Sequence, residues 1–104
     1  MSHVRYLRVA SVGDMEGKQV LGAEVDGSKI MIVKTSQGLR ALDAICTHEY
    51  ADLTRGIISG DTVICPLHFS RFNLITGEVE TPPADAPLRV YPVKVEGNEI
   101  YVGV

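Results

Sequence analysis

The chain has 104 residues, of which 45% are hydrophobic and 22% are charged, and its formal net charge is −3. This composition excludes a disordered or fibrous chain and predicts one globular domain over residues 1–104. The small negative charge argues against nucleic acid or an anionic membrane as a partner, because both bind basic patches.

Short predicted strands follow one another along the chain, and no long stretch repeats apolar residues with a helical period. The first strands are expected at residues 4–9, 19–25, 29–35 and 39–45, with tight turns at residues 26–27 and 36–38. Further strands are expected at residues 61–67, 71–75, 78–80, 88–95 and 99–104. Many short strands at close spacing predict an all-β protein, a small antiparallel β-sandwich or barrel.

Two segments have a more specific interpretation. Residues 30–33 are apolar at consecutive positions, so we expect a strand that is buried on both faces. The prolines at positions 82, 83 and 87 have no N–H to donate, so residues 81–87 are expected to form an ordered loop and not a central strand.

Both cysteines of the chain are closely followed by a histidine. The pairs are Cys46-Thr47-His48 and Cys65-Pro66-Leu67-His68, and sixteen residues separate them. Each pair follows a predicted strand, so two loops facing each other would bring two thiolates and two imidazoles together. His3 lies outside this pattern and is given no role.

The chain has no apolar signal segment and no run of about eighteen apolar residues, which predicts a cytoplasmic protein with no membrane partner. Thiols stay reduced in that compartment, so a disulfide between Cys46 and Cys65 is disfavoured. The four residues instead suit either a tetrahedral zinc ion or a 2Fe-2S cluster. Zinc fingers usually place like ligands together, whereas each loop here supplies one Cys and one His, an arrangement that favours the cluster.

The pattern Cys-x-His, sixteen residues, Cys-x-x-His resembles the Rieske iron–sulfur motif. Residues 46–102 as a whole are similar to the cluster-binding and C-terminal parts of Rieske-type ferredoxins, the electron carriers of bacterial aromatic-ring dioxygenase systems. The resemblance implies a cluster-binding subdomain at about residues 45–84, built from two ligand loops and a proline loop. It also implies one 2Fe-2S cluster per chain, with Cys46 and Cys65 on the inner iron and His48 and His68 on the outer iron.

The function implied by the resemblance is that of a one-electron carrier and not of an enzyme. The carrier would be monomeric, would accept electrons from a flavoprotein reductase and would pass them to a terminal oxygenase. An alternative is a Rieske-like small subunit of a nitrite reductase-type oxidoreductase. Such subunits often lack the ligands, and all four are present here.

Four residues bear on the properties of the cluster. Quinol-oxidising relatives of the family have a serine and a tyrosine whose hydroxyls donate to sulfur; Ser70 matches the serine, but Phe72 stands in place of the tyrosine. A reduction potential in the lower half of the Rieske range, roughly −150 to +300 mV, is therefore expected. Phe69 stands where glycine is common in the family, and Glu49 follows His48 where glycine or another small or polar residue is common. Both are candidates for the docking surface; the alternatives are that Phe69 packs against the proline loop and that Glu49 is a solvated acid.

Overall fold

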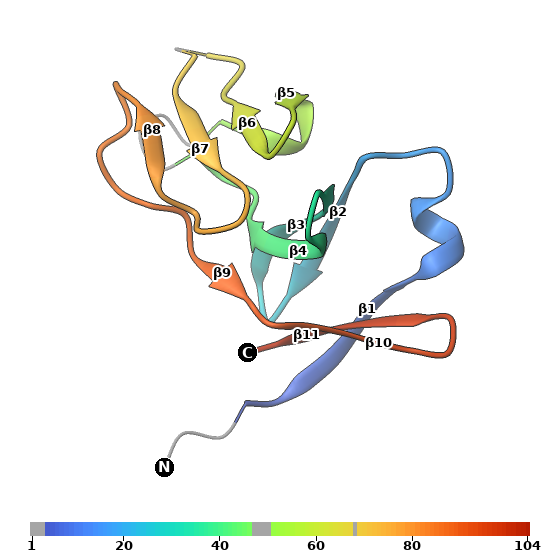
Figure 1. The fold of residues 1–104 in the computed structure, drawn as a ribbon. Helices are drawn as coiled ribbons and strands as arrows, with labels where there is room; N and C mark the ends of the chain where they lie inside the picture. Colours follow the sequence, from blue (N-terminus) through green and yellow to red (C-terminus); the bar gives the residue numbers. More distant parts are fainter. Residues whose placement is uncertain (1–3, 47–50, 68) are drawn as a thin grey trace.

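The computed structural model describes residues 4–46, 51–67 and 69–104. These residues form three antiparallel sheets, with strand orders β1-β11-β10, β2-β3-β4-β9 and β5-β6-β7-β8 (Figure 1). The predicted all-β fold is confirmed. The strands are β1 (Tyr6–Ser11), β2 (Val20–Val25), β3 (Ser28–Thr35), β4 (Gly38–Asp43), β5 (Ile57–Ser59), β6 (Thr62–Ile64), β7 (Arg71–Asn73), β8 (Val79–Thr81), β9 (Val90–Tyr91), β10 (Val93–Glu96) and β11 (Glu99–Gly103).

Four predicted strands were too long or too continuous, among them the one expected at residues 71–75, which ends at Asn73. The strand expected at residues 39–45 ends at Asp43, and the one expected at 61–67 ends at Ile64, two residues before Pro66. The strand expected at 88–95 is divided at Pro92 into β9 and β10, which belong to different sheets. Proline has no N–H to donate, so the ladder cannot continue through it.

Three short elements were not predicted. They are the 3-10 helices η1 (Val12–Met15) and η2 (Leu53–Arg55) and the strand β5. Each has only three or four residues, which is too short for a hydrophobic period to be recognised. No helix in the described part of the chain is long and apolar enough to cross a membrane.

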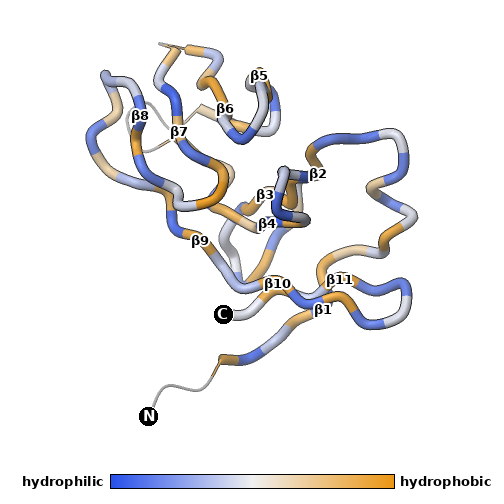
Figure 2. The backbone as a smooth tube through the Cα atoms, viewed as in Figure 1, coloured by the Kyte–Doolittle hydropathy of each residue, from blue (hydrophilic) through white to orange (hydrophobic). Residues whose placement is uncertain are grey.

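Strand β3 lies between two hydrophobic cores and contributes side chains to both. Residues Ile30, Met31, Ile32 and Val33 all have no exposed surface, which confirms that this strand is buried on both faces. Because side chains alternate along a strand, Met31 and Val33 belong to the core beneath the β5-β6-β7-β8 sheet. Ile30 and Ile32 belong to the other core, with residues of the β1-β11-β10 sheet. In Figure 2 hydrophobic backbone segments accordingly follow β3 and β4, between the other two sheets.

Two carboxylates connect parts of the fold that are distant in sequence. Asp61, in the β5–β6 turn, accepts hydrogen bonds from the backbone N (2.8 Å) and the side chain of Ser36, in the β3–β4 turn. These bonds lower the pKa of Asp61. Asp43, at the end of β4, accepts a 2.6 Å hydrogen bond from the hydroxyl of Tyr91 and a 3.2 Å bond from the backbone N of Arg89. The β5–β6 turn is thereby held to the β3–β4 turn, and β9 to β4.

The bond from Tyr91 to Asp43 generates a pH-dependent prediction. Burial and Asp43 raise the pKa of Tyr91 from 10.0 to about 12. Because the pKa of Tyr91 is raised in the folded state, the hydrogen bond to Asp43 stabilises the fold fully below pH 10.0, and this stabilisation is lost as the pH rises through about 12. We expect Tyr91→Phe to lower the free energy of unfolding by about 1 kcal/mol at neutral pH.

The difference in the free energy of unfolding between Tyr91→Phe and the unsubstituted protein should shrink between pH 10 and 12. Urea unfolding at pH 7, 9 and 11 would measure this difference. Tyr101→Phe on β11 is the matched control, because no hydrogen bond of the Tyr101 hydroxyl is found within the described ranges. If this difference stays constant up to pH 11, the hydrogen bond from Tyr91 to Asp43 does not stabilise the fold in the way proposed.

Candidate metal centre

The two cysteines begin two loops that are closed in the same way. The backbone N of Cys46 donates to the carbonyl of Ala51 (2.8 Å), and the backbone N of Cys65 donates to the carbonyl of Ser70 (2.8 Å). We call residues 46–51 the first ligand loop and residues 65–70 the second ligand loop. In both loops the bond joins a cysteine to the residue five positions later, so the two Cys–His segments start from equivalent backbone positions.

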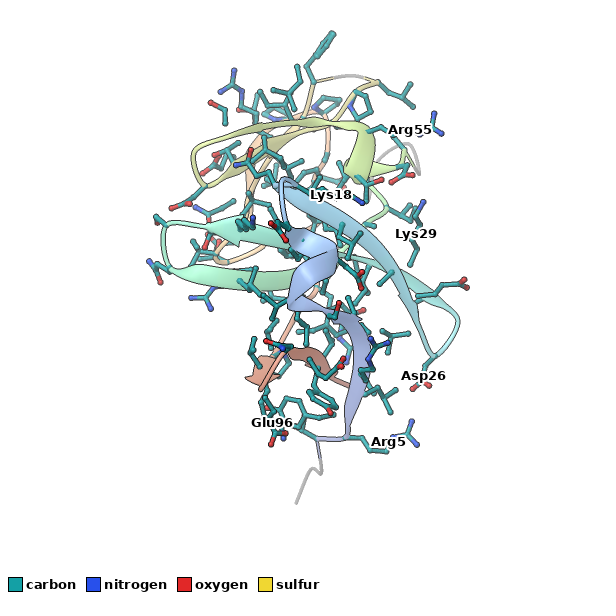
Figure 3. The ribbon with its side chains drawn as sticks, turned by 90° about the vertical axis from the view of Figure 1, so that its right-hand side faces the viewer. Arg5, Lys18, Asp26, Lys29, Arg55 and Glu96 are labelled. Atoms are coloured by element: carbon teal, nitrogen blue, oxygen red, sulfur yellow. The ribbon has the colours of Figure 1, made fainter. Side chains whose placement is uncertain are left out.

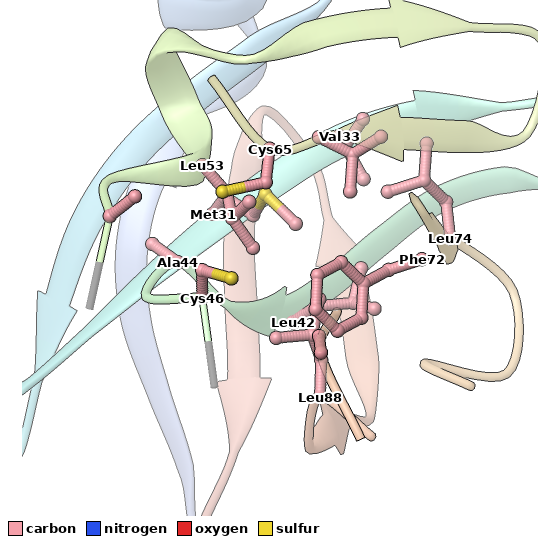
Figure 4. Close-up of a cluster of buried hydrophobic side chains, with 13 residues drawn as sticks. Met31, Val33, Leu42, Ala44, Cys46, Leu53, Cys65, Phe72, Leu74 and Leu88 are labelled. Atoms are coloured by element: carbon pink, nitrogen blue, oxygen red, sulfur yellow. The ribbon is translucent and has the colours of Figure 1, made fainter. Parts of the chain in front are cut away.

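Both cysteine side chains lie in the core and not on the surface. Cys46 and Cys65 are each 1% exposed and belong to the same cluster of buried side chains. Figure 4 shows the two cysteines on the same side of that cluster, near Met31, Ala44 and Leu53. They are not joined in a disulfide. Two thiols gathered in one apolar region suit a soft metal or an iron–sulfur cluster, because thiolates are the preferred ligands of both.

The second ligand loop leads from the core to the surface within a few residues. Leu67 is 53% exposed and Phe69 is 66% exposed, so Phe69 does not bury itself against the proline loop, one of the two roles considered for it. The backbone N of Phe69 donates to the carbonyl of Cys65 (3.1 Å), and the φ of Phe69 is 62°. That left-handed conformation suits glycine and is unfavourable for a bulky residue, which accounts for the glycine commonly found here in the family.

Ser70 connects the second ligand loop to the proline loop, residues 82–87. Its side chain is buried, and its Oγ accepts a 2.9 Å hydrogen bond from the backbone N of Ala84. A serine hydroxyl that accepts one bond keeps its own hydrogen to donate. Ser70 is therefore compatible with donation to a sulfur while it holds the proline loop. Phe72 is fully buried in the same core, as expected for a core aromatic residue.

The outer face of the β5-β6-β7-β8 sheet has an unusual row beside the second ligand loop. Ile57, Ile64, Arg71 and Thr81 are paired in register across the four strands. Ile57 is 62% exposed on an edge strand, where polar residues are the norm. Pro66, Pro82 and Pro83 are also exposed. This end of the molecule thus presents apolar side chains to the solvent.

The remaining predicted site residues lie outside the described part of the chain. These are His48 and His68, together with Glu49 next to His48. Within residues 4–46, 51–67 and 69–104, no three side chains of His, Cys, Asp or Glu are grouped closely enough to hold a metal ion. The donor set described by the structure is thus the pair of buried cysteines.

The sequence singled out Ser70 but did not predict the contacts that hold the loops in place. The hydrogen bond to Ser70 is donated by the backbone N–H of Ala84, so the identity of residue 84 gives no sequence signal for it. Asp52 caps η2 by accepting a bond from the backbone N of Thr54 (3.0 Å) and also contacts Lys29. The Asp-x-Thr spacing is a known turn signal, but the contact with Lys29 joins residues that are far apart in sequence.

Comparison with known proteins agrees with this geometry. Residues 5–92 match the family described as "Rieske [2Fe-2S] domain". The biphenyl dioxygenase ferredoxin subunit of Pseudomonas sp. strain KKS102 is 33% identical over 93% of this chain and 90% of its own. The ferredoxin of carbazole 1,9a-dioxygenase from Nocardioides aromaticivorans IC177 is 32% identical, with a TM-score of 0.85 over 93% of this chain and 95% of its own. A chain of the complex of reduced oxygenase and oxidized ferredoxin in carbazole 1,9a-dioxygenase is 31% identical, with a TM-score of 0.84 over 93% and 91% of the two chains.

These matches define an iron–sulfur protein whose cofactor is a 2Fe-2S cluster. The chain belongs to the Rieske family, and it resembles the ferredoxin components of dioxygenase systems over most of its length.

Ser70 provides a structural test of the centre. In Ser70→Ala the buried backbone N of Ala84 loses its acceptor, which costs roughly 1–3 kcal/mol for an unsatisfied buried donor. We expect urea unfolding to show that loss of stability. Ser59→Ala, on the exposed edge of the same sheet, is the control and should change stability little. Equal stability of Ser70→Ala and the unsubstituted protein would show that the Oγ does not anchor the proline loop.

Proposed function

We propose that this protein is a cytoplasmic, monomeric one-electron carrier that accepts electrons from a flavoprotein reductase and passes them to a terminal oxygenase. The relatives support the role of carrier, since they are named as ferredoxin components, and one solved structure is of a ferredoxin in complex with its oxygenase. The reductase, the acceptor and the monomeric state belong to the proposal. So does the organisation as a single Rieske domain over residues 1–104, with its cluster-binding part at about residues 45–84.

One observation carries the proposal. The second ligand loop begins with a buried cysteine and presents Leu67 and Phe69 to the solvent only a few residues later. A cofactor held at Cys65 would therefore be close to an exposed apolar surface. Such a surface suits a small and transient contact with a protein partner better than the binding of a small molecule.

The ligand set is a second part of the proposal. Cys46, His48, Cys65 and His68 would hold the cluster, which supplies reversible one-electron chemistry when bound. The two buried cysteines support the inner half of this set. The outer half rests on the sequence motif, in which a histidine follows each cysteine. His3, near the N-terminus, has no part in it.

The docking surface would be centred on the exposed end of the second ligand loop. Of the residues described there, Phe69, Arg71, Pro82 and Pro83 are exposed. Neither burial nor backbone conformation explains a phenylalanine at position 69, because the side chain is 66% exposed and its φ is 62°. Residues kept in unfavourable conformations are concentrated at functional sites, which supports a role for Phe69 in recognition.

The alternative, a small subunit of a nitrite reductase-type oxidoreductase, has weaker support. The relatives that are at least 30% identical over nine-tenths of both chains are named as ferredoxins. A putative NADH-dependent nitrite reductase small subunit from Mycobacterium tuberculosis also matches over nearly the whole of both chains, with a TM-score of 0.84, but is only 20% identical, which supports a shared fold alone. Copurification with a large catalytic subunit, in place of transient electron transfer, would favour this alternative.

Replacement of an outer ligand tests the ligand set. In His68→Cys a neutral imidazole becomes an anionic thiolate, which disfavours the addition of an electron. We expect a lower reduction potential by voltammetry, provided that the cluster is retained. His3→Ala is the control and should leave the potential unchanged. An intact cluster with an unchanged or higher potential in His68→Cys would show that His68 is not a ligand.

Phe69 tests the docking surface. Phe69→Ala should slow reduction of an oxygenase that the unsubstituted protein reduces, by roughly fivefold or more in stopped-flow experiments, because a central aromatic contact is worth about 1 kcal/mol or more. The spectrum and potential of the cluster should not change. Val95→Ala is the control, since Val95 is also exposed (46%) but lies on β10, in another sheet.

A companion variant separates docking from backbone effects. Phe69→Gly removes the same side chain and also relieves the left-handed backbone, which should stabilise the protein by roughly 1 kcal/mol. Both variants should therefore transfer electrons slowly, and only Phe69→Gly should gain stability. If both transfer electrons at the unsubstituted rate, Phe69 is not a docking residue.

A further inference from the structure

The base of the first ligand loop is a short antiparallel ladder. The backbone N of Leu53 donates to the carbonyl of Ala44 (2.7 Å), Ile45 and Asp52 form an isolated β-bridge, and Cys46 donates to Ala51 (2.8 Å). These three successive pairs run from the end of β4 to the start of the loop. The position of Cys46 is therefore fixed by how firmly the two sides of this ladder are held.

Lys29 contacts both sides of the ladder. On the entry side, its backbone carbonyl accepts a 3.1 Å hydrogen bond from the N of Ala44. On the exit side, its Nζ lies 2.6 Å from Oδ2 of Asp52. Lys29 lies on β3 directly before the fully buried residues Ile30–Val33, so its backbone continues into the segment that is buried on both faces. Figure 3 shows Lys29 on the same side of the molecule as Arg55, the last residue of η2.

Both carboxylate oxygens of Asp52 are used. Oδ1 accepts bonds from the backbone N (3.0 Å) and from Oγ1 (2.6 Å) of Thr54, while Oδ2 contacts Lys29. Burial raises the pKa of Asp52, but the bonds from Lys29 and Thr54 outweigh it, and the net pKa lies below the usual value. Asp52 is therefore ionised at neutral pH, and its contact with Lys29 is a charge-assisted hydrogen bond.

We propose that Lys29 is a positioning residue for the cluster, whose side chain holds the exit side of the first ligand loop against β3. The inference rests on the proposed ligand set, in which that loop carries Cys46 and His48. The backbone of Lys29 holds the entry side whatever its side chain is. The side chain adds the second attachment, and without it the ladder can open from the Asp52 side.

The second ligand loop is attached differently. There the cross-link is the neutral bond from the N of Ala84 to Oγ of Ser70, in a buried environment. Among the described residues, an ion pair is found at the first ligand loop and not at the second. Lys29 should consequently affect retention of the cluster and the geometry of one pair of ligands, and not the proline loop.

The experiment compares the rate of cluster loss from the holoprotein at a fixed urea and iron-chelator concentration, followed by visible absorbance. Lys29→Gln should lose its cluster about two- to fivefold faster, the range expected for a partly exposed ion pair. Its reduced state should also give broader EPR lines, because a loosened ligand loop samples more geometries. Lys29→Arg, which keeps the charge, should restore both properties.

Arg5→Gln is the matched control. It removes one positive charge from a contact with Asp26 (3.1 Å), in the turn of the same β2–β3 hairpin, and this contact does not involve a ligand loop. Its rate of cluster loss and EPR line width should equal those of the unsubstituted protein. A general effect of charge would appear equally in both variants.

Asp52→Asn tests the same contact by changing the residue that Lys29 binds. The double variant Lys29→Gln/Asp52→Asn should lose its cluster no faster than Asp52→Asn alone, since residues in contact do not act additively. The proposal is overturned if Lys29→Gln retains its cluster and line width unchanged, if Arg5→Gln accelerates the loss to the same extent, or if the two substitutions add fully. Because no partner protein is needed, failure here leaves the electron-carrier role standing. An error in the ligand set would instead appear in the potential of His68→Cys.

Discussion

The burial of β3 on both faces is the constraint on which the rest of the structure depends. Four successive residues, Ile30–Val33, have no exposed surface, and alternate side chains face different cores. Each such side chain contributes roughly 1.5–3 kcal/mol on burial, so the strand can neither move nor tilt without exposing one of the two cores. A slip of one residue would exchange the two sets of side chains, and β3 therefore fixes its own register. The two cysteines that begin the ligand loops pack in the same core as Met31 and Val33 of this strand.

The centre combines a rigid interior with an exposed end. The cysteines lie among aliphatic side chains and Phe72, where close packing fixes their positions. A few residues later, the second ligand loop presents Leu67 and Phe69 to the solvent. An exposed phenylalanine in a left-handed conformation reduces stability, and glycine would be the more stable residue at this position. Such local costs are tolerated at functional positions, which is consistent with selection for recognition at this end of the molecule.

Much of this could be predicted from the sequence because the signals were local. The consecutive apolar residues at positions 30–33 predicted a strand buried on both faces, and the Asp26-Gly27 pair predicted the β2–β3 turn, where both residues have positive φ. The Cys–His spacing predicted the family, which the comparison with known proteins confirmed. The prediction of where strands end was less accurate. It did not take account of Pro92, which divides β9 from β10, or of β5, which has only three residues.

What could not be predicted are contacts between segments that are distant in the chain. Lys29 and Asp52 are 23 residues apart, and Ser70 and Ala84 are 14 apart. Neither pair has a spacing that marks it as a contact, since each depends on how whole sheets are placed. In each pair one partner lies in or directly after a ligand loop, Ser70 in the second and Asp52 after the first, and the other partner lies on a different element.

The two attachments differ physically, and the difference affects how the centre responds to its surroundings. The contact between Lys29 and Asp52 is ionic and partly exposed, with side chains 43% and 26% accessible, so dissolved salt screens it. The bond between Ala84 and Ser70 is neutral and buried, so salt affects it little. The second ligand loop, which also bears the exposed apolar residues, thus has the attachment that is insensitive to salt. The first ligand loop depends on a contact that ionic strength weakens. Salt should therefore loosen the centre from the Cys46 side first, while the end that carries Leu67 and Phe69 keeps its shape.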